Sequence, residues 1–220
     1  MKRTPLYKYI LVAIAMSGIT VAAILFSCDF YRIIPLYVSL MVMLLQTNAN
    51  RNCFLLGGLN AAYYSIVYFL LGLYGMALYN LLIACPIQIW TFIRWRKRAY
   101  AQAAVLRRLS NHQRAGWLLG FSAAWIVLYF ILDAFGSGYL ILDNTISIIS
   151  TAGNFASLLY LIEFPFIQIL SHSLNIILNL QMIGTDPKQW TYLVYFIYAL
   201  VCAILSAITL HKLYREQQQS

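Results

Sequence analysis

The sequence predicts an all-α polytopic membrane protein that crosses the bilayer eight times. Hydrophobic residues make up 62% of the 220-residue chain and charged residues only 10%, and the mean hydropathy is +0.75. An average soluble domain is roughly 25% charged, so this chain has too few charges to cover the surface of a soluble protein of its size. Composition therefore excludes a soluble globular enzyme and a disordered chain.

Eight apolar runs follow one another along the chain, and most reach the roughly 17–25 residues that a span requires. Each must be helical, because hydrocarbon offers no partner to an open backbone amide. The connections are short except for residues 94–114, which divide the chain into two four-span halves. The first run lacks a cleavage site and is interpreted as a retained signal anchor. The expected spans are residues 9–27, 33–49, 53–72, 74–93, 115–135, 141–161, 164–184 and 190–211.

The basic residues predict the orientation of the chain. With all eight spans present, all but two of the 15 Lys and Arg residues fall on one side, and only Arg32 and Lys188 fall on the other. This is the bias of the positive-inside rule, so we expect a plasma (cell) membrane protein with both termini and residues 94–114 in the cytoplasm. Trp95 and Trp190, near span ends, are expected to anchor it at the membrane interfaces.

Several function classes are excluded by what the sequence lacks. The net charge of +9 lies in the connections, where it serves topology and lipid contact, so no nucleic-acid partner is expected. No carboxylate lies at mid-span, which argues against proton or sodium coupling through a buried acid, although a sodium site of carbonyls and hydroxyls stays open. The chain has no C-x-x-C pair and no metal, phosphate-loop or nucleophile motif, so no enzyme, cofactor or metal is expected.

Polar residues inside the spans define a candidate binding site. Gln168, His172 and Asn175 share one face of the seventh span, because residues three and four apart are neighbours on a helix. Asn80 and Gln88 are eight residues apart, about two turns, and share a face of the fourth span. The two faces are interpreted as the walls of one cavity. The alternative is helix–helix glue, in which each polar contact contributes about 0.6–2 kcal/mol.

Three further residues complete the candidate substrate-binding set. Trp90 is deep enough in its span to stack on a ring-shaped solute, and Asn60 and Tyr195 add polar groups from the third and eighth spans. His172 is interpreted as a hydrogen-bonded group rather than a proton relay. Pro86 is expected to kink its helix and free a carbonyl near mid-membrane, and a substrate site, a hinge and simple packing all remain open.

Several short motifs are shared with a known family: residues 52–60 (NCFLLGGLN), Leu73-Tyr74, Trp90, Leu142-Asp143, Ser150 and Glu163. On these motifs, residues 33–215 resemble the bacterial nicotinamide riboside transporters of PnuC type. That family is similar to the SWEET sugar transporters, so the resemblance implies a SWEET-like 3+1+3 core behind an extra N-terminal helix. The implied division is 1–32 for the extra helix, 33–114 for the first bundle and basic loop, 115–140 for the linker helix, and 141–220 for the second bundle and tail.

The positions that hold nicotinamide riboside in that family are changed here. In the fourth-span pattern Asn80 stands at the Gln position and only Trp90 survives, and in the seventh-span pattern Pro165, Gln168 and His172 replace two tryptophans and an asparagine. A retained scaffold with a rewritten pocket implies a related but different ligand, since related members are linked to thiamine, riboflavin and deoxynucleosides. We expect a small, neutral-to-cationic, ring-containing metabolite, with nicotinamide riboside as the best single candidate.

The preferred hypothesis is a facilitative uptake transporter with alternating access between two helical bundles. The resemblance implies functional coupling to a cytoplasmic kinase that traps the substrate. One alternative is a vitamin-binding membrane subunit that needs an ATPase partner, and another is a structural membrane protein without a ligand. Transport by the purified chain alone separates the first hypothesis from the second. A homo-oligomer is left open.

Overall fold

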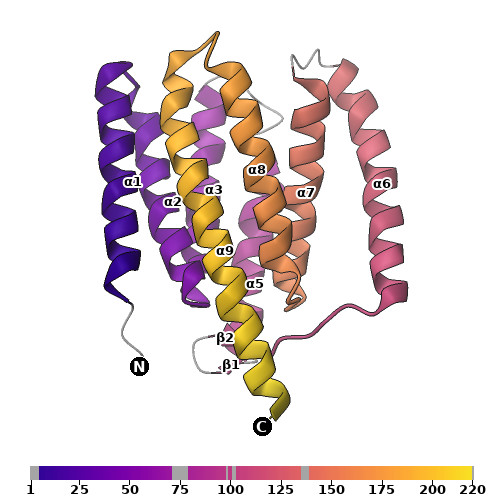
Figure 1. Ribbon diagram of the computed structural model, residues 1–220. Helices are drawn as coiled ribbons and strands as arrows, with labels where there is room; N and C mark the ends of the chain where they lie inside the picture. The colour runs from indigo at the N-terminus through magenta and orange to yellow at the C-terminus, as the bar shows by residue number, and fades with distance from the viewer. Residues whose placement is uncertain (1–4, 71–78, 98, 101–102, 135–138, 220) are drawn as a thin grey trace.

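The computed structural model describes residues 5–70, 79–97, 99–100, 103–134 and 139–219. These residues form eight long helices that run side by side and point alternately up and down (Figure 1). The all-helical architecture predicted from the sequence is therefore confirmed. Lys2, Arg3, Arg98 and residues 74–78 of the fourth expected span lie outside the described residues.

The helices begin and end close to the expected span limits. A π-helix, η1 (Asn80–Ala84), leads into α5, and a short 3₁₀ turn, η2 (Pro187–Gln189), leads into the last helix. The long helices are α1 (Leu6–Leu25), α2 (Phe30–Thr47), α3 (Asn52–Leu70), α5 (Cys85–Lys97), α6 (Asn111–Ala134), α7 (Leu140–Leu158), α8 (Phe164–Met182) and α9 (Trp190–Gln219).

Within the described residues, four helical stretches are long and apolar enough to cross a membrane by length and composition alone. These are α1, α2, α6 and the stretch Pro187–Gln219. The helices α3, α7 and α8 have 19 residues each, about 28 Å of helix, which is close to the roughly 30 Å of a bilayer core. They carry many of the polar residues discussed below.

The helices pack as two neighbouring groups. In the first half, α2 packs on α3 and α3 on α5, and in the second half, α7 packs on α8 and α8 on α9. The two halves meet where α2 contacts α9 and where α5 contacts α7. Helix α6 contacts α7 and has no buried residue along its length, so its surface is left for lipid.

Helix α1 packs against α9 and α2 at the side of the two halves. Gly18 permits a close approach to α9, because a Cβ at this position would lie 3.0 Å from a methyl group of Val194. Near the start of α1, the buried Lys8 Nζ donates hydrogen bonds to the carbonyl oxygen of Thr47 at 2.9 Å and to Asn48 Oδ1 at 2.7 Å. A cation at the carboxyl end of α2 satisfies carbonyl groups that the helix itself leaves open.

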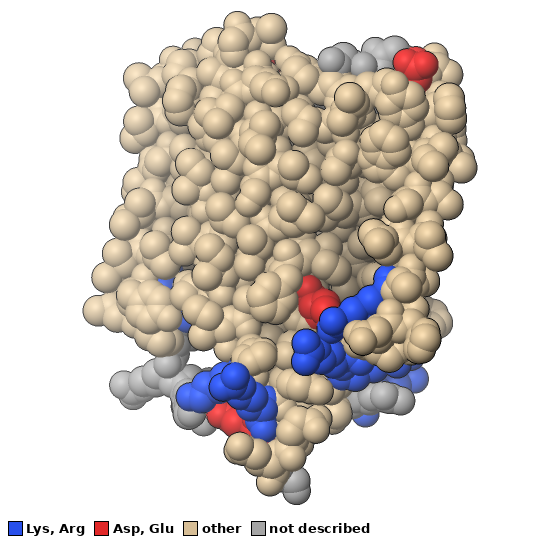
Figure 2. Space-filling view, turned by 45° about the vertical axis from the view of Figure 1, so that its right-hand side comes forward, with Lys and Arg blue, Asp and Glu red and all other residues tan. Residues whose placement is uncertain are grey.

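One end of the bundle carries the start of α1, the end of α9 and the described part of residues 94–114 (Figure 1), and with them most of the described Lys and Arg residues. We call it the basic end. Figure 2 places the blue Lys and Arg side chains along this lower edge, below a broad uncharged surface. At the opposite end, Arg32 lies 3.8 Å from Asp186 and Lys188 lies 3.1 Å from Asp29. We call this the ion-pair end.

The connection between the halves is ordered at several points along its course. A two-residue hairpin pairs β1 (Ala99–Tyr100) with β2 (Ala103–Ala104). Further on, Arg107 exchanges backbone hydrogen bonds with Tyr160 and Ile162, each at 3.0 Å. Glu163 then accepts from the Leu109 amide at 3.2 Å and from the Arg114 guanidinium at 2.9 Å. These bonds tie the connection to the turn between α7 and α8.

Candidate binding cavity

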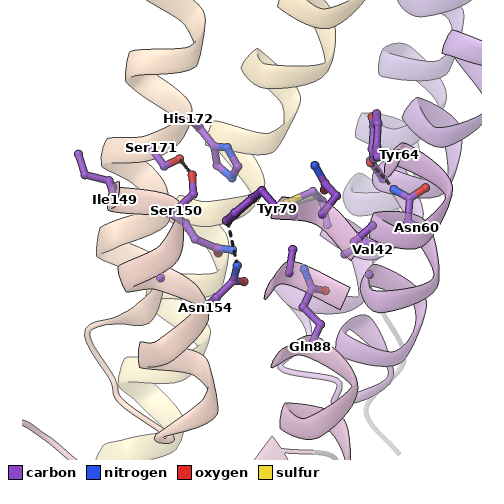
Figure 3. Close-up of a pocket in the computed structure, with 18 of the residues that line it drawn as sticks. Val42, Asn60, Tyr64, Tyr79, Gln88, Ile149, Ser150, Asn154, Ser171 and His172 are labelled. Carbon is purple, nitrogen blue, oxygen red and sulfur yellow. Dashed lines mark hydrogen bonds between the residues drawn. The ribbon is translucent and has the colours of Figure 1, made fainter. Parts of the chain in front are cut away.

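A cavity of about 270 Å³ lies between the two halves (Figure 3). One wall comes from α2, α3, η1 and α5, and the other from α7, α8 and α9. The lining residues are Ser39, Val42, Met43, Gly57, Asn60, Ala61, Tyr64, Tyr79, Asn80, Ala84, Gln88, Ile149, Ser150, Gly153, Asn154, Ile167, Gln168, Ser171, His172 and Tyr195.

The structure brings together six of the eight residues that the sequence singled out. They come from five helical elements of both halves, which supports the interpretation of the two polar faces as walls of one cavity. The six are Asn60, Asn80, Gln88, Gln168, His172 and Tyr195.

Trp90 and Asn175 lie outside the cavity, and the prediction for them is corrected here. Trp90 is 61% exposed on the outer surface. It follows Gln88 by two residues, about 200° around a helix, so it points away when Gln88 points inward. The Asn175 amide donates instead to the carbonyl of Ser171 at 2.9 Å, one turn earlier on its own helix.

The π-helix explains why Asn80 and Gln88 share a face. The Cys85 amide donates to the Asn80 carbonyl, a five-residue step that is wider than an α-helical turn. The wide turn absorbs about one extra residue, so the eight-residue spacing corresponds to roughly two full turns. Pro86 follows directly and has no N–H to donate, which removes an α-helical hydrogen bond at this point.

Gly57 makes room for the Gln88 side chain in the cavity wall. A Cβ at Gly57 would overlap with Gln88 Oε1, so a larger residue would displace this amide. The next residue, Gly58, would place a Cβ 2.9 Å from Ile89 and 3.4 Å from the carbonyl oxygen of Cys85. The two glycines therefore allow the close packing of α3 on α5.

Some polar atoms of the cavity wall are satisfied by the protein, and others are not. Asn60 Nδ2 donates to the Pro35 carbonyl at 3.1 Å and to Ser39 Oγ at 2.8 Å, and this fixes α3 to α2. In the described part of the chain, Asn60 Oδ1 and both ring nitrogens of His172 have no hydrogen-bond partner. His172 is only 8% exposed. Buried polar groups normally have partners, so these atoms are candidates for contact with a solute.

The α7 side supplies hydroxyl and amide groups that are not in the binding set expected from the sequence. Ser150 and Ser171 share a hydrogen bond of 2.9 Å, and Asn154 Nδ2 donates across the cavity to the Tyr79 hydroxyl at 3.4 Å (Figure 3). Ser39 was missed because it lies alone in the apolar second span. The seven-residue spacing between Ser39 and Gln46, about two turns, was the signal that α2 has an inward polar face.

Between the cavity and the basic end, the two halves contact each other directly. The Gln46 amide on α2 pairs with the Gln168 amide on α8. Nearer that end lies an aromatic plug, which we define as Phe54, Trp95, Tyr160 and Phe164. The Trp95 ring is 4.8 Å from Phe54 and 6.3 Å from Tyr160, and Phe54 is 6.0 Å from Phe164.

Trp95 lies at the centre of this plug, so its expected role as an interface anchor is wrong. It is 2% exposed, and its Nε1 donates to the Ser157 carbonyl on α7 at 2.8 Å. By contrast, Trp190 is 39% exposed and stacks on Phe26, as an interface residue can. Nearness to a span end therefore did not distinguish the two tryptophans.

Comparison with known proteins identifies the family. A family model described as "Nicotinamide mononucleotide transporter" matches residues 29–209, which is most of the chain. The chain belongs to the nicotinamide mononucleotide transporter family. It is accordingly a multi-pass membrane protein of a transporter family, and the resemblance noted from its motifs is confirmed.

A solved structure of this fold agrees with that assignment. The protein described as "Crystal structure of the Vitamin B3 transporter PnuC" matches with a TM-score of 0.81 at 16% sequence identity, covering 99% of this chain and 95% of that one. At this identity the likeness establishes the fold alone. A comparison with curated proteins gave no match. Helix α1 lies outside the matched region of the family model but within the share covered by the structural match.

Proposed function

We propose that this chain is a facilitative transporter for uptake of a small, ring-containing vitamin or nucleoside-type metabolite. Nicotinamide riboside is the best single candidate substrate. The proposal rests on membership of a transporter family together with a polar cavity between two helical halves.

The main observation in favour of this substrate class is that the cavity wall is polar but uncharged. None of its described lining residues is Asp, Glu, Lys or Arg, whereas amides, hydroxyls and one imidazole are abundant. A phosphorylated nucleotide brings about two negative charges, which would need cationic partners in a buried site. A nucleoside brings hydroxyls and an amide or ring nitrogen, which this wall can bind. We therefore favour the riboside over the mononucleotide named in the family description.

The size of the cavity supports the same class. Its volume of about 270 Å³ lies near the lower limit of ligand pockets, which range over roughly 300–1,000 Å³. A molecule of one ring and one sugar suits this space. Tyr64, Tyr79 and Tyr195 take the role of aromatic contacts that the sequence had assigned to Trp90.

We further propose that transport proceeds by alternating access between two three-helix bundles. The first is α2, α3 and α5, the second is α7, α8 and α9, and α6 is the linker of a 3+1+3 core. These units correspond to the expected divisions 33–114, 141–220 and 115–140, with 1–32 as the additional N-terminal helix. Packing within each half and the peripheral position of α6 support this division. The basic end is proposed to face the cytoplasm, with the protein in the plasma membrane.

The decisive experiment is uptake into proteoliposomes that contain only this chain. The solutes are radiolabelled nicotinamide riboside, nicotinamide mononucleotide, thiamine, riboflavin and a deoxynucleoside, with and without an imposed ion gradient. We expect equilibrating uptake of one uncharged or cationic solute without a gradient, and no uptake of the mononucleotide. Absence of flux for every solute, with retained binding of one, would instead favour the subunit that needs an ATPase partner.

Two variants of the same helix assign any flux to the cavity. His172→Ala removes a side chain whose ring nitrogens have no protein partner, so we expect a roughly tenfold or larger loss of uptake, the effect of losing one or two hydrogen bonds to the solute. Asn175→Ala lies one turn further on α8, outside the cavity, and serves as the matched control. Equal losses in both variants would contradict the assignment of the site. Trapping of the product by a cytoplasmic kinase stays a prediction.

A further inference from the structure

A second concave surface lies on the outside of the protein, away from the cavity between the halves. It is an apolar groove of about 560 Å³ along α8 and α9, near the basic end. The groove has two chemically distinct parts, one apolar and one basic. Its lining residues are Phe166, Ile169, Ile204, Ala207, Ile208, His211, Lys212 and Arg215.

The two parts follow one another along a single stripe of α9. Ile204, Ile208, Lys212 and Arg215 recur at intervals of four, four and three residues, which places them on one helix face. The apolar members are open to the surroundings, since Ile204 is 44% and Ile208 63% exposed, and Phe166 on α8 is 55% exposed. An apolar strip therefore leads directly into a pair of cations.

The groove crosses the boundary between the hydrocarbon and the headgroups at the basic end. Trp190 marks the interface at the ion-pair end, and a hydrocarbon core of about 30 Å corresponds to about 20 helical residues. The core therefore ends near residue 210. Ile204 and Ile208 lie at the depth of acyl chains, whereas Lys212 and Arg215 lie at the depth of headgroups. At 1.5 Å per residue, Ile204 lies about 9 Å inside the core and Arg215 about 8 Å beyond its edge.

The charge of the basic part is available to a ligand. Among the residues that the structure describes, the cations of the four ion pairs are Arg32, Arg114 and Lys188. Neither Lys212 nor Arg215 takes part in any of these pairs. We propose that the groove binds one anionic phospholipid, with an acyl chain along Ile204 and Ile208 and the phosphate between Lys212 and Arg215. Since α8 and α9 also carry Gln168, His172 and Tyr195, a lipid held here contacts the helices of the cavity wall from outside.

The test compares lipid retention by the full chain in detergent, measured by native mass spectrometry. The probes are phosphatidylglycerol and phosphatidylcholine with identical acyl chains, and glycerol 3-phosphate as the headgroup without chains. We expect one retained phosphatidylglycerol, weaker retention of phosphatidylcholine and none of glycerol 3-phosphate. Lys212→Gln with Arg215→Gln should weaken phosphatidylglycerol binding roughly 10- to 30-fold, because each basic residue near the phosphate contributes about fivefold.

A matched double variant separates the groove from general surface charge. Arg96→Gln with Arg108→Gln also removes two positive charges, from exposed positions at the same end but outside the groove. This variant should change phosphatidylglycerol retention less than twofold. Ile208→Asn keeps both cations and should weaken both phospholipids. Equal losses in the two double variants, or equal retention of phosphatidylcholine, would overturn the proposal. Because all five positions are exposed, a folded variant is expected and is verified by size-exclusion chromatography.

Discussion

The two halves of the bundle are joined by contacts of opposite character at its two ends. At the basic end, the halves meet through buried neutral groups: the Gln46–Gln168 amide pair and the aromatic plug around Trp95. At the ion-pair end, they meet through Asp29 and Lys188, whose side chains are 40% and 33% exposed. Water replaces an exposed ion pair at little cost, whereas opening a buried plug exposes apolar surface and leaves polar groups without partners.

This difference bears on the proposed transport cycle. Alternating access requires one end to open while the other stays closed. The contacts between the halves predict that the ion-pair end separates more easily, and that the form described here is held together mainly at the basic end. The predictions below test this asymmetry, beginning with the largest expected effect.

The largest loss of stability is expected for Trp95→Ala. This substitution removes a side chain that is 2% exposed and also the hydrogen bond to the Ser157 carbonyl. Large-to-small substitutions of buried aromatic residues cost about 3–5 kcal/mol, so the midpoint of thermal unfolding in detergent should fall clearly. Trp90→Ala, on the same helix but 61% exposed, is the matched control and should change it little. A similar loss in both variants would mean that the buried contacts of Trp95 are not what stabilises the basic end.

The second prediction concerns the amide pair above the plug. Gln46→Ala removes a buried amide and leaves the half-buried Gln168 amide without its hydrogen bonds, so we expect a cost at or below the lower end of the roughly 1–3 kcal/mol of a buried unpaired group. A double-mutant cycle of Gln46→Ala with Gln168→Ala, followed by chemical denaturation, should reveal a coupling energy of about 0.5–3 kcal/mol. A coupling of zero would mean that the two amides act independently, and that the plug alone closes this end.

The sequence predicts the helices far better than the inward direction of each side chain. Apolar runs and basic connections suffice for the spans, because a bilayer permits few alternatives to a helix of the right length. The inward direction depends on local detail: the π-helix aligns Asn80 with Gln88, and Gly57 admits the Gln88 amide. Neither follows from an ideal 3.6-residue period. The outward direction of Trp90 could have been predicted, since it follows Gln88 by about 200°.

The burial of each side chain also could not be predicted from the sequence. Trp95 and Trp190 both lie near span ends and both contact residues that are distant in sequence, yet only Trp95 is enclosed, between Phe54 of the first half and Tyr160 of the second. Such contacts depend on how the halves pack together. Likewise, Ser39 and Gln46 are single polar residues of an apolar span. Ser39 gains its partner, Asn60, where α2 packs on α3, and Gln46 gains Gln168 where α2 lies opposite α8.

The third prediction uses the same substitution at both ends. Lys8 is buried and donates two hydrogen bonds at the carboxyl end of α2, whereas Lys188 is half-buried in the ion-pair end. Lys8→Met should cost about 1–3 kcal/mol, because the carbonyl of Thr47 loses a charged donor in a buried position. Lys188→Met should cost less, as exposed pairs generally do. Both values come from denaturant unfolding in detergent, and an inverted order would mean that burial does not set the cost of losing a cation at these two ends.

The smallest expected effect is the pH dependence that Asp29 contributes at the ion-pair end. The Lys188 ammonium donates to Asp29 Oδ2 at 3.1 Å and, together with Arg32, holds the pKa of the Asp29 carboxyl below its usual value. A lowered pKa in the folded state means that the pair stabilises the fold above the unfolded pKa, about 3.9, and that this contribution is lost as the pH falls through the folded value.

Acidification from pH 7 to 3 should therefore lower the unfolding midpoint slightly in the wild-type protein, and less in Lys188→Met, where this partner is already absent. High salt should mimic acid at this end, because exposed charges are screened within about 3 Å at 1 M ionic strength. The Trp95→Ala loss should be unchanged by salt, since its contacts are buried and neutral. If salt altered the two losses alike, the closures of the two ends would share one electrostatic origin, and the contrast between a buried neutral end and an exposed charged end would fail.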